Sequence, residues 1–162
     1  MSDTIDGYAE AILAVVKAEG ATGADDELYR FAQALEANDE LRTALTDARL
    51  PAARRQQIVE DLLGGKASPV ATAAVSMVVA AGRAADLSRI ARSVADKGAA
   101  ATGREVAEVR SAVALSDDQK ARLTASLKQA TGKDVEVKVI VDPSVLGGVV
   151  TTIGDTVIDG SV

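Results

Sequence analysis

The sequence predicts an α+β protein in which an N-terminal six-helix bundle is followed by a small β-α-β-β domain. Two observations support this prediction. Up to about residue 104, apolar side chains recur every three or four residues, which is the period of a helix packed on one face. Beyond that point the period shortens to two, as in a strand, most clearly in the valines of 135–141. We therefore place two domains, at 1–104 and 105–162.

The first three helices each have a recognisable start or stop. The apolar stripe of the first helix covers 5–16 and ends before Gly20. The acidic run 25–27 starts the second helix, because negative charge stabilises a helix N-terminus. Asn38 can cap the third helix, since its side chain accepts a hydrogen bond from a free backbone N–H. Three helices therefore fit before Pro51.

Proline and glycine delimit the fourth and sixth helices. Pro51 suits the first turn of the fourth, where a missing backbone N–H breaks no hydrogen bond, and Gly64 ends it. The sixth helix follows Gly82 and runs towards Gly98 or Gly103. Six helices therefore fill the first domain.

The fifth helix, over 70–81, differs from the others because small and apolar residues lie on several of its faces. Ser68 and Pro69 give its start signal. We expect this helix to be buried nearly all round, at the centre of the bundle. Its expected inner face comprises Val70, Ala73, Ala74, Met77, Val78 and Ala81.

The second domain begins with a predicted strand over 106–113. A helix follows, because Ser116 and Gln119 have the spacing of a capping box, and it extends to Gly132. Alternation and turn residues then predict further strands over 135–141, 149–153 and 156–158.

The turns of this domain contain glycine and aspartate. A phosphate-binding loop needs a lysine and a helix after its glycines, whereas Gly147 and Gly148 lead into a strand. Asp142, Asp155 and Asp159 could begin a divalent-cation site, but the first two fit turn positions, which is the interpretation we favour. We expect structural turn roles for Asp142, Pro143, Gly147, Gly148, Gly154, Asp155 and Gly160.

The composition leaves little room for catalysis. The chain has neither histidine nor cysteine, which removes the commonest metal ligand, the commonest general base and every thiolate nucleophile. We expect no catalytic residue, no bound metal and no cofactor. The lack of cysteine also favours a reducing compartment.

Charge and hydropathy argue against two further classes of protein. The net charge is −6, and one Phe and two Tyr offer few rings on which bases could stack, so we expect no nucleic-acid binding. The longest apolar run, 70–82, is shorter than the roughly 20 residues that span a bilayer. The acidic start of the chain contains no apolar signal segment. We expect no secretion signal and no direct insertion into a membrane.

Several short motifs follow one another along the chain. They are YAEAIL at 8–13, LEANDELRTAL at 35–45, AAGRAADLSRI at 80–90, VRSAVALSDDQ at 109–119, TGKDVEV at 131–137, VDPSVLGGV at 141–149 and IGDTVIDGSV at 153–162. In this order they resemble the delta-subunit family of bacterial rotary ATP synthases, which is related to the mitochondrial oligomycin-sensitivity-conferring protein. The last two motifs are the most specific.

The chain departs from the family pattern at two places. Asp6 and Gly7 stand where the family often has an arginine before its Tyr-Ala pair. Family members also usually continue past the DGSV motif with a basic helix, whereas this sequence stops at Val162. We therefore expect the second domain to lack that terminal helix.

The resemblance implies a structural subunit and not an enzyme. In the family, the N-terminal helical domain holds N-terminal segments of the alpha subunits of the catalytic head, and the C-terminal domain holds the b subunit of the peripheral stalk. One copy per complex, at the cytoplasmic face of the bacterial plasma membrane, resists the torque of the rotor during ATP synthesis. An alpha-subunit helix is expected in a groove between the first and fifth helices. The contact residues implied there are Tyr8, Ala9, Ile12, Ala74, Met77 and Val78.

Two other functions stay open on the sequence. One is a helical adaptor module that binds a different protein through the same groove. The other is an enzyme or nucleotide-binding protein built around the terminal acids and glycines. The closing motifs favour the ATP synthase subunit over both.

Overall fold

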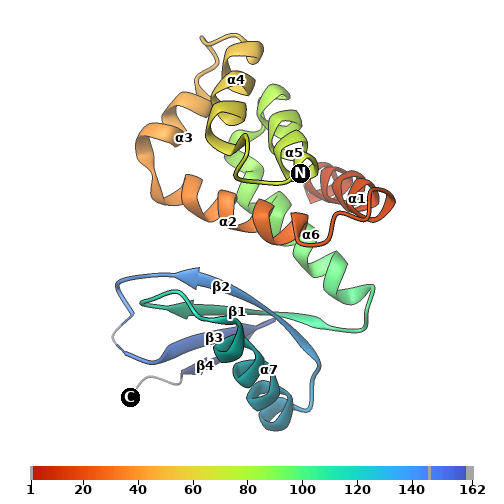
Figure 1. Cartoon of the computed structure of the whole chain (residues 1–162), viewed down its shortest axis with the longest axis vertical. Coiled ribbons are helices and arrows are strands. Elements are labelled where there is room, and N and C mark those ends of the chain that lie inside the picture. Colours follow the sequence, from red (N-terminus) through yellow and green to blue (C-terminus); the bar gives the residue numbers. More distant parts are fainter. Residues whose placement is uncertain (1, 146, 160–162) are drawn as a thin grey trace. The chain divides into compact units, whose positions relative to one another are not determined.

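The structure is a computed structural model that describes residues 2–145 and 147–159. The mixed α+β class predicted from the sequence is confirmed, with helices first and a sheet after them (Figure 1). The chain forms two compact units, Met1–Lys97 and Gly98–Val162. This division falls before the sequence-based boundary at 104, because the last three residues of the sixth helix belong to the second unit.

The first unit is helical. Its elements are α1 (Ser2–Ala18), α2 (Ala24–Ala37), α3 (Asp39–Thr46), α4 (Ala52–Leu63), α5 (Pro69–Ala80), a short 3-10 helix η1 (Ala84–Asp86) and α6 (Leu87–Ala100). Within this unit α5 contacts α1, α2 and α4. The helix that the sequence places at the centre therefore has neighbours on several sides.

The predicted capping residues act at the helix starts. The Asn38 side chain accepts a 3.0 Å hydrogen bond from the Leu41 backbone N–H at the start of α3. The Ser68 hydroxyl accepts a 3.2 Å bond from the Ala71 N–H at the start of α5. Pro51 stands at the N-cap of α4, one position before the predicted first turn. Asn38 and Ser68 thus accept hydrogen bonds from backbone N–H groups that a helix N-terminus leaves unpaired, whereas Pro51 has no such N–H group.

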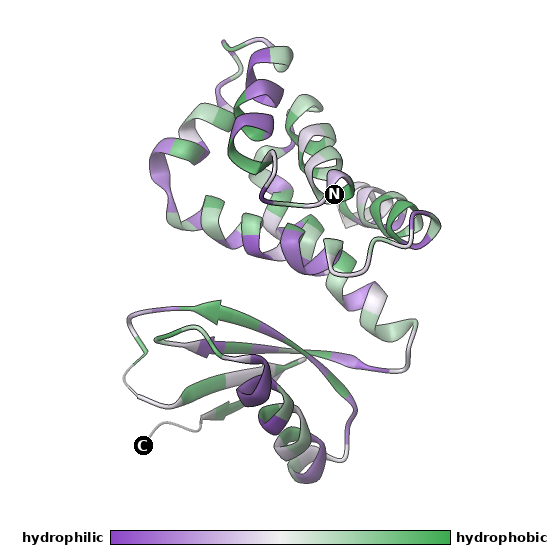
Figure 2. Ribbon diagram, viewed as in Figure 1, coloured by the Kyte–Doolittle hydropathy of each residue, from purple (hydrophilic) through white to green (hydrophobic). Residues whose placement is uncertain are grey.

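The core of the first unit is built from branched aliphatic side chains. Its largest fully buried members are Leu28, Leu45, Val59, Val75, Val78, Val79, Leu87, Ile90 and Val94. Figure 2 shows α5 in the pale and green tones of small and apolar residues, whereas α4 includes clearly hydrophilic positions. None of the helices described is both long enough and apolar enough to cross a membrane.

The predicted inner face of α5 is correct for Ala74 and Val78 but wrong for three other residues. Ala73, Met77 and Ala81 are exposed, and Val70 is half-buried. The buried positions are Ala71, Ala74, Val75, Ser76, Val78 and Val79. Because nearly every side of α5 carries small or apolar residues, the sequence period did not determine which side packs inward. The helix is therefore buried on one broad face and open on the other.

Polar side chains tie the helices of the first unit together. The Ser93 hydroxyl of α6 donates a 2.9 Å hydrogen bond to the Asp6 carboxylate of α1. One helical turn further along, Lys97 lies 3.5 Å from Glu10 across the same pair of helices. Asp6 and Glu10 thus link α1 to α6.

The second unit is an α/β layer. Its elements after α6 are β1 (Glu105–Ser111), α7 (Asp117–Thr131), β2 (Val135–Val141), β3 (Val149–Ile153) and β4 (Thr156–Asp159). The strand order is β2-β1-β3-β4, with β1 parallel to β2 and the other pairs antiparallel. The described residues form four strands, which match the four predicted strand segments, so the β-α-β-β formula leaves out one of them.

The helix of this unit packs on one side of the sheet. The capping box predicted for α7 is present, with the Gln119 N–H bonded to Ser116 Oγ at 3.1 Å and the Ser116 N–H bonded to Gln119 Oε1 at 2.8 Å. The core under α7 consists of Ala107, Leu127, Val135 and Ile153. β1 ends at Ser111, so Val113, predicted as part of the strand, lies beyond it and is exposed.

Candidate partner-binding groove

An apolar groove runs between α1 and α5 in the first unit. Its volume is about 130 Å³. The residues that line it are Ala11, Ile12 and Val15 from α1, and Val70, Ala73, Ala74 and Met77 from α5. No charged side chain is among these lining residues, so the groove favours an apolar occupant.

Helical spacing explains why these side chains share one surface. Positions 70, 73, 74 and 77 are separated by three or four residues, so they form one stripe along α5. Ala11 and Val15 lie one turn apart on α1 in the same way. Val15 is 50% exposed and Met77 is 41% exposed, which is unusual for large apolar side chains at such a stripe. The groove therefore presents apolar surface that this unit leaves uncovered.

The residues implied by the resemblance are distributed between this groove and the core. Ile12, Ala74 and Met77 line the groove. Ala9 and Val78 are fully buried and belong to the core of the unit, so they do not line the groove. Tyr8 is half-buried and lies one turn before Ile12 on α1, at one end of the row of groove residues.

Sequence reasoning missed four of the lining residues, Ala11, Val15, Val70 and Ala73, as parts of this site. The sequence does contain a signal for Val15. Adjacent valines at 15 and 16 point to different sides of the helix, so they make the apolar surface broader than one buried stripe. Alanine gives no such signal, since it is common on buried and exposed helix faces.

Arg83, between α5 and η1, is held by its own neighbours. Its guanidinium lies 3.3 Å from the Asp86 carboxylate, and its backbone N–H bonds to the Val78 carbonyl at 3.0 Å. The arginine thus helps to close the end of α5.

The predicted turn residues of the second unit stand where the chain reverses. The Asp142 carboxylate accepts hydrogen bonds from the Ser144 hydroxyl at 2.7 Å and the Ser144 N–H at 3.0 Å. These bonds, with Arg110 nearby, hold the pKa of Asp142 below its usual value of 3.8. The oxygens of Asp142 thus bond within the loop itself, which agrees with the expected turn role.

The two adjacent glycines lead into a strand. Gly147 and Gly148 have φ angles of 70° and 64°, a conformation that side chains rarely adopt, and β3 follows directly. Gly154 and Asp155 form the turn between β3 and β4. Gly160 lies outside the described residues, and so does the side chain of Asp159.

The chain matches one protein family over nearly its whole length. The model of the ATP synthase delta (OSCP) subunit family covers residues 5–162. The match therefore includes both the helical unit and the sheet.

Curated relatives with the name ATP synthase subunit delta match the chain at about 40% identity. The protein from Frankia alni is 42% identical, over 94% of this chain and 56% of its own. The one from Nocardia farcinica is 44% identical, over 85% of this chain and 51% of its own. The one from Acidothermus cellulolyticus is 37% identical, over 100% of this chain and 60% of its own. The chain spans about half the length of the relatives it matches.

A solved structure shares the fold. It is a chain in the cryo-EM structure of the Toxoplasma gondii mitochondrial ATP synthase hexamer. The TM-score is 0.57 at 22% identity, and the likeness covers 98% of this chain and 90% of the other. At this identity the likeness concerns the fold.

Proposed function

The chain belongs to the ATP synthase delta (OSCP) subunit family, and from this premise we propose that it is a non-catalytic stator component of a rotary, proton-translocating ATP synthase. In this role it joins the catalytic head to the peripheral stalk. It resists the torque of the rotor, so that rotation changes the conformation of catalytic sites and is not lost in turning the head.

The single observation that supports this proposal is the uncovered apolar groove between α1 and α5. An amphipathic helix binds such a groove by inserting apolar side chains spaced three or four residues apart. We propose that the occupant is an N-terminal helix of an alpha subunit of the catalytic head. Val15 and Met77 form the exposed walls, and Ile12 and Ala74 form the buried floor.

We assign the second partner to the second unit. The sheet and α7 of Gly98–Val162 are proposed to hold the b subunit of the peripheral stalk. One copy of the chain would then serve one complex, at the cytoplasmic face of the bacterial plasma membrane. Membrane association would come from the other subunits of the complex.

Calorimetric titration tests the first contact. The full chain is titrated with a synthetic peptide that has the N-terminal sequence of the alpha subunit from the same cells. Val15→Glu places a charge in the apolar wall, and we expect it to weaken binding by at least about tenfold. Because Val15 is half-exposed, the melting temperature should change little.

Val113→Glu is the matched control. It makes the same change at an exposed valine of the other unit, so it should leave the peptide affinity as it is. An equal loss in both variants would contradict the groove assignment. A pull-down of the tagged chain that recovers other proteins but no alpha, beta or stalk subunit would contradict the stator role itself.

A further inference from the structure

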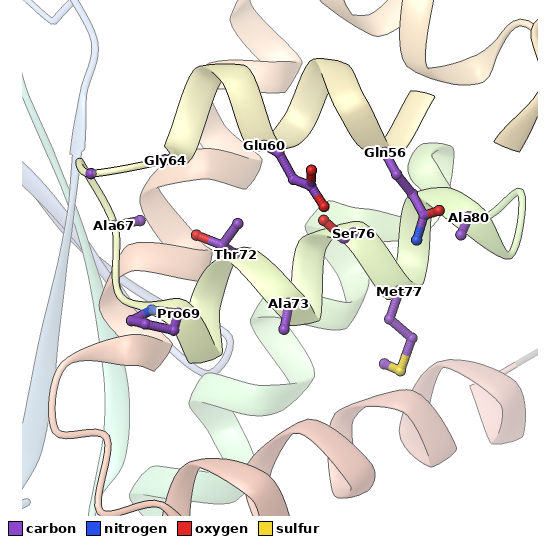
Figure 3. A pocket seen from close by; sticks show the side chains of 11 residues that line it. Gln56, Glu60, Gly64, Ala67, Pro69, Thr72, Ala73, Ser76, Met77 and Ala80 are labelled. Atoms are coloured by element: carbon purple, nitrogen blue, oxygen red, sulfur yellow. The ribbon is translucent and has the colours of Figure 1, made fainter. Parts of the chain in front are cut away.

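A second groove lies on the other flank of α5, between that helix and α4 (Figure 3). Its volume is about 740 Å³, so it is much larger than the apolar groove beside α1. It lies wholly within the first unit. The two grooves share Ala73 and Met77 of α5, but they differ in chemistry.

The first unusual feature of this α4–α5 groove is a hydroxyl without a hydrogen bond. Ser76 lines the groove and is only 8% exposed. Among the described residues, its Oγ has no hydrogen-bond partner. A buried hydroxyl that bonds to nothing destabilises the fold, and an alanine there would avoid this cost. The arrangement is explained if a ligand supplies the missing partner.

The second feature is a carboxylate without a counter-ion. Glu60 of α4 lines the groove, and Figure 3 shows its side chain directed from α4 towards Ser76 on α5. Within the described part of the chain, no cation forms a salt bridge with Glu60, and no lysine or arginine lines the groove. The Gln56 amide comes from the same face of α4, one turn earlier. Glu60 is exposed and Ser76 is buried, so the groove offers a cation one carboxylate at its surface and one hydroxyl deeper inside.

The third feature is the shape of the remaining surface. Small residues form much of the lining, namely Gly64, Gly65, Ala67, Ala73 and Ala80. Small side chains allow the backbone of another helix to approach closely, and Met77 adds an adaptable apolar contact at the edge. Gly64 cannot gain a side chain without a shift, because a Cβ there would lie 2.7 Å from the Glu60 carbonyl oxygen.

We propose that the α4–α5 groove binds a helical segment of a partner protein through one lysine or arginine, whose charged group pairs with Glu60 and hydrogen-bonds to Ser76. The negative charge of Glu60 selects a cation over an anionic occupant such as a phosphate. Small residues and Met77 accept the apolar side of the same helix. This site goes beyond the proposed contact at the α1–α5 groove, which contains no charged residue.

The test uses the full chain and three designed peptides. Each is an amphipathic helix of about 18 residues, with alanine and leucine on one side and glutamine on the other. The central position of the apolar side is lysine, norleucine or glutamate. By fluorescence anisotropy we expect the lysine peptide to bind about tenfold more tightly than the norleucine peptide, and the glutamate peptide to bind most weakly.

Variants of the chain then locate the interaction. Glu60→Gln should abolish the preference for lysine over norleucine. Asp61→Asn is the matched control, since Asp61 is an exposed acid of α4 that bonds to Gln57 and is absent from the groove lining, and it should keep the preference. Ser76→Ala should weaken lysine-peptide binding severalfold while the melting temperature stays the same or rises.

Three outcomes would overturn the proposal. They are equal binding of all three peptides, no binding up to about 1 mM, and a lysine preference that survives Glu60→Gln. Val15→Glu separates this site from the α1–α5 groove. Lysine-peptide binding that is lost in Val15→Glu but kept in Glu60→Gln would reject the second site and leave the proposed stator contact standing.

Discussion

The Ser68 backbone N–H donates a 2.7 Å hydrogen bond to the Glu27 carboxylate, which joins the first turn of α2 to the N-cap of α5. At the same time the Ser68 hydroxyl accepts from the Ala71 N–H. These two bonds set where α5 begins and how it is placed against α2. α5 forms one wall of both grooves. By fixing the start of α5, Glu27 therefore helps to position both grooves although it lines neither.

Replacing Glu27 by alanine should lower the free energy of unfolding by about 1–3 kcal/mol, because it leaves a partly buried N–H without its charged acceptor. Urea denaturation followed by circular dichroism measures this change. Glu19→Ala, at an exposed acid in the loop after α1, should stay within about 0.5 kcal/mol of the parent. Similar effects of the two substitutions would show that the Glu27 bond contributes nothing.

Tyr8→Ala separates a contact role from a core role. Tyr8 is half-buried and lies one turn before Ile12 on α1, although it is not among the residues that line the α1–α5 groove. If it anchors the partner, affinity for the alpha-subunit peptide should fall by about 1–3 kcal/mol with the fold intact. Calorimetry gives the affinity, and a thermal melt of the same variant gives the stability. Lost stability with unchanged affinity would assign Tyr8 to the core.

The Asp142 carboxylate should titrate below its ordinary pKa of 3.8, because hydrogen bonds from Ser144 favour the charged form. A lowered pKa stabilises the fold above the unfolded-state value, and that contribution disappears as the pH falls through the folded-state pKa. The pH dependence below about pH 4 should therefore be shallower in Asp142→Asn. NMR titration of the carboxyl carbon should also show the pKa rising towards 3.8 in Ser144→Ala. An unmoved pKa in that variant would rule out the hydroxyl bond of Ser144 as its main cause.

Two glycine-to-alanine changes should act in opposite directions. Gly7 lies inside α1 and Gly132 caps α7 with φ 73°, and an added Cβ has open space at both. Gly7→Ala should stabilise the protein by up to about 1 kcal/mol through helix propensity. Gly132→Ala should destabilise it by about 1–2 kcal/mol, because alanine disfavours the left-handed conformation. If chemical denaturation showed that both substitutions change the free energy of unfolding in the same direction, backbone preference would not explain their effects.

A fragment of residues 1–102 should fold by itself. It contains α1 to α6 complete, including the three residues of α6 that follow Lys97. Its far-ultraviolet circular dichroism should be helical and its thermal melt cooperative, and it should bind the alpha-subunit peptide as the full chain does. A fragment without cooperative unfolding would show that the helices depend on the second unit.

Sequence analysis correctly predicted the elements that are determined by residues close together in the chain, such as helix caps and an alternating strand. The capping box of Ser116 and Gln119 starts α7, and Asn38 starts α3, because a side chain three residues from a free N–H needs no tertiary information. The alternation of 135–141 gave β2 for the same reason. In these segments the residues that determine the structure lie within a few positions of one another in the sequence.

The parts that sequence reasoning missed depend on tertiary packing. In α5 nearly all side chains are small or apolar, so the face that holds Ala73 and Met77 was predicted to be inside and is outside. The α4–α5 groove was not predicted at all, because Glu60 and Ser76 come from different helices and gain meaning only when these are adjacent. The first groove was predicted through the family resemblance, yet four of its seven lining residues could be identified only from the packed helices.

Met77 is shared by the two grooves, and this makes them energetically linked. The Met77 side chain is flexible and lines both grooves. A partner helix that binds in one groove and contacts the Met77 thioether would take that side chain away from the wall of the other groove. Occupancy on one flank of α5 must then alter the affinity on the other flank, and by the same factor in both directions. A single methionine would thus make the two partners cooperative or competitive, although they never touch each other.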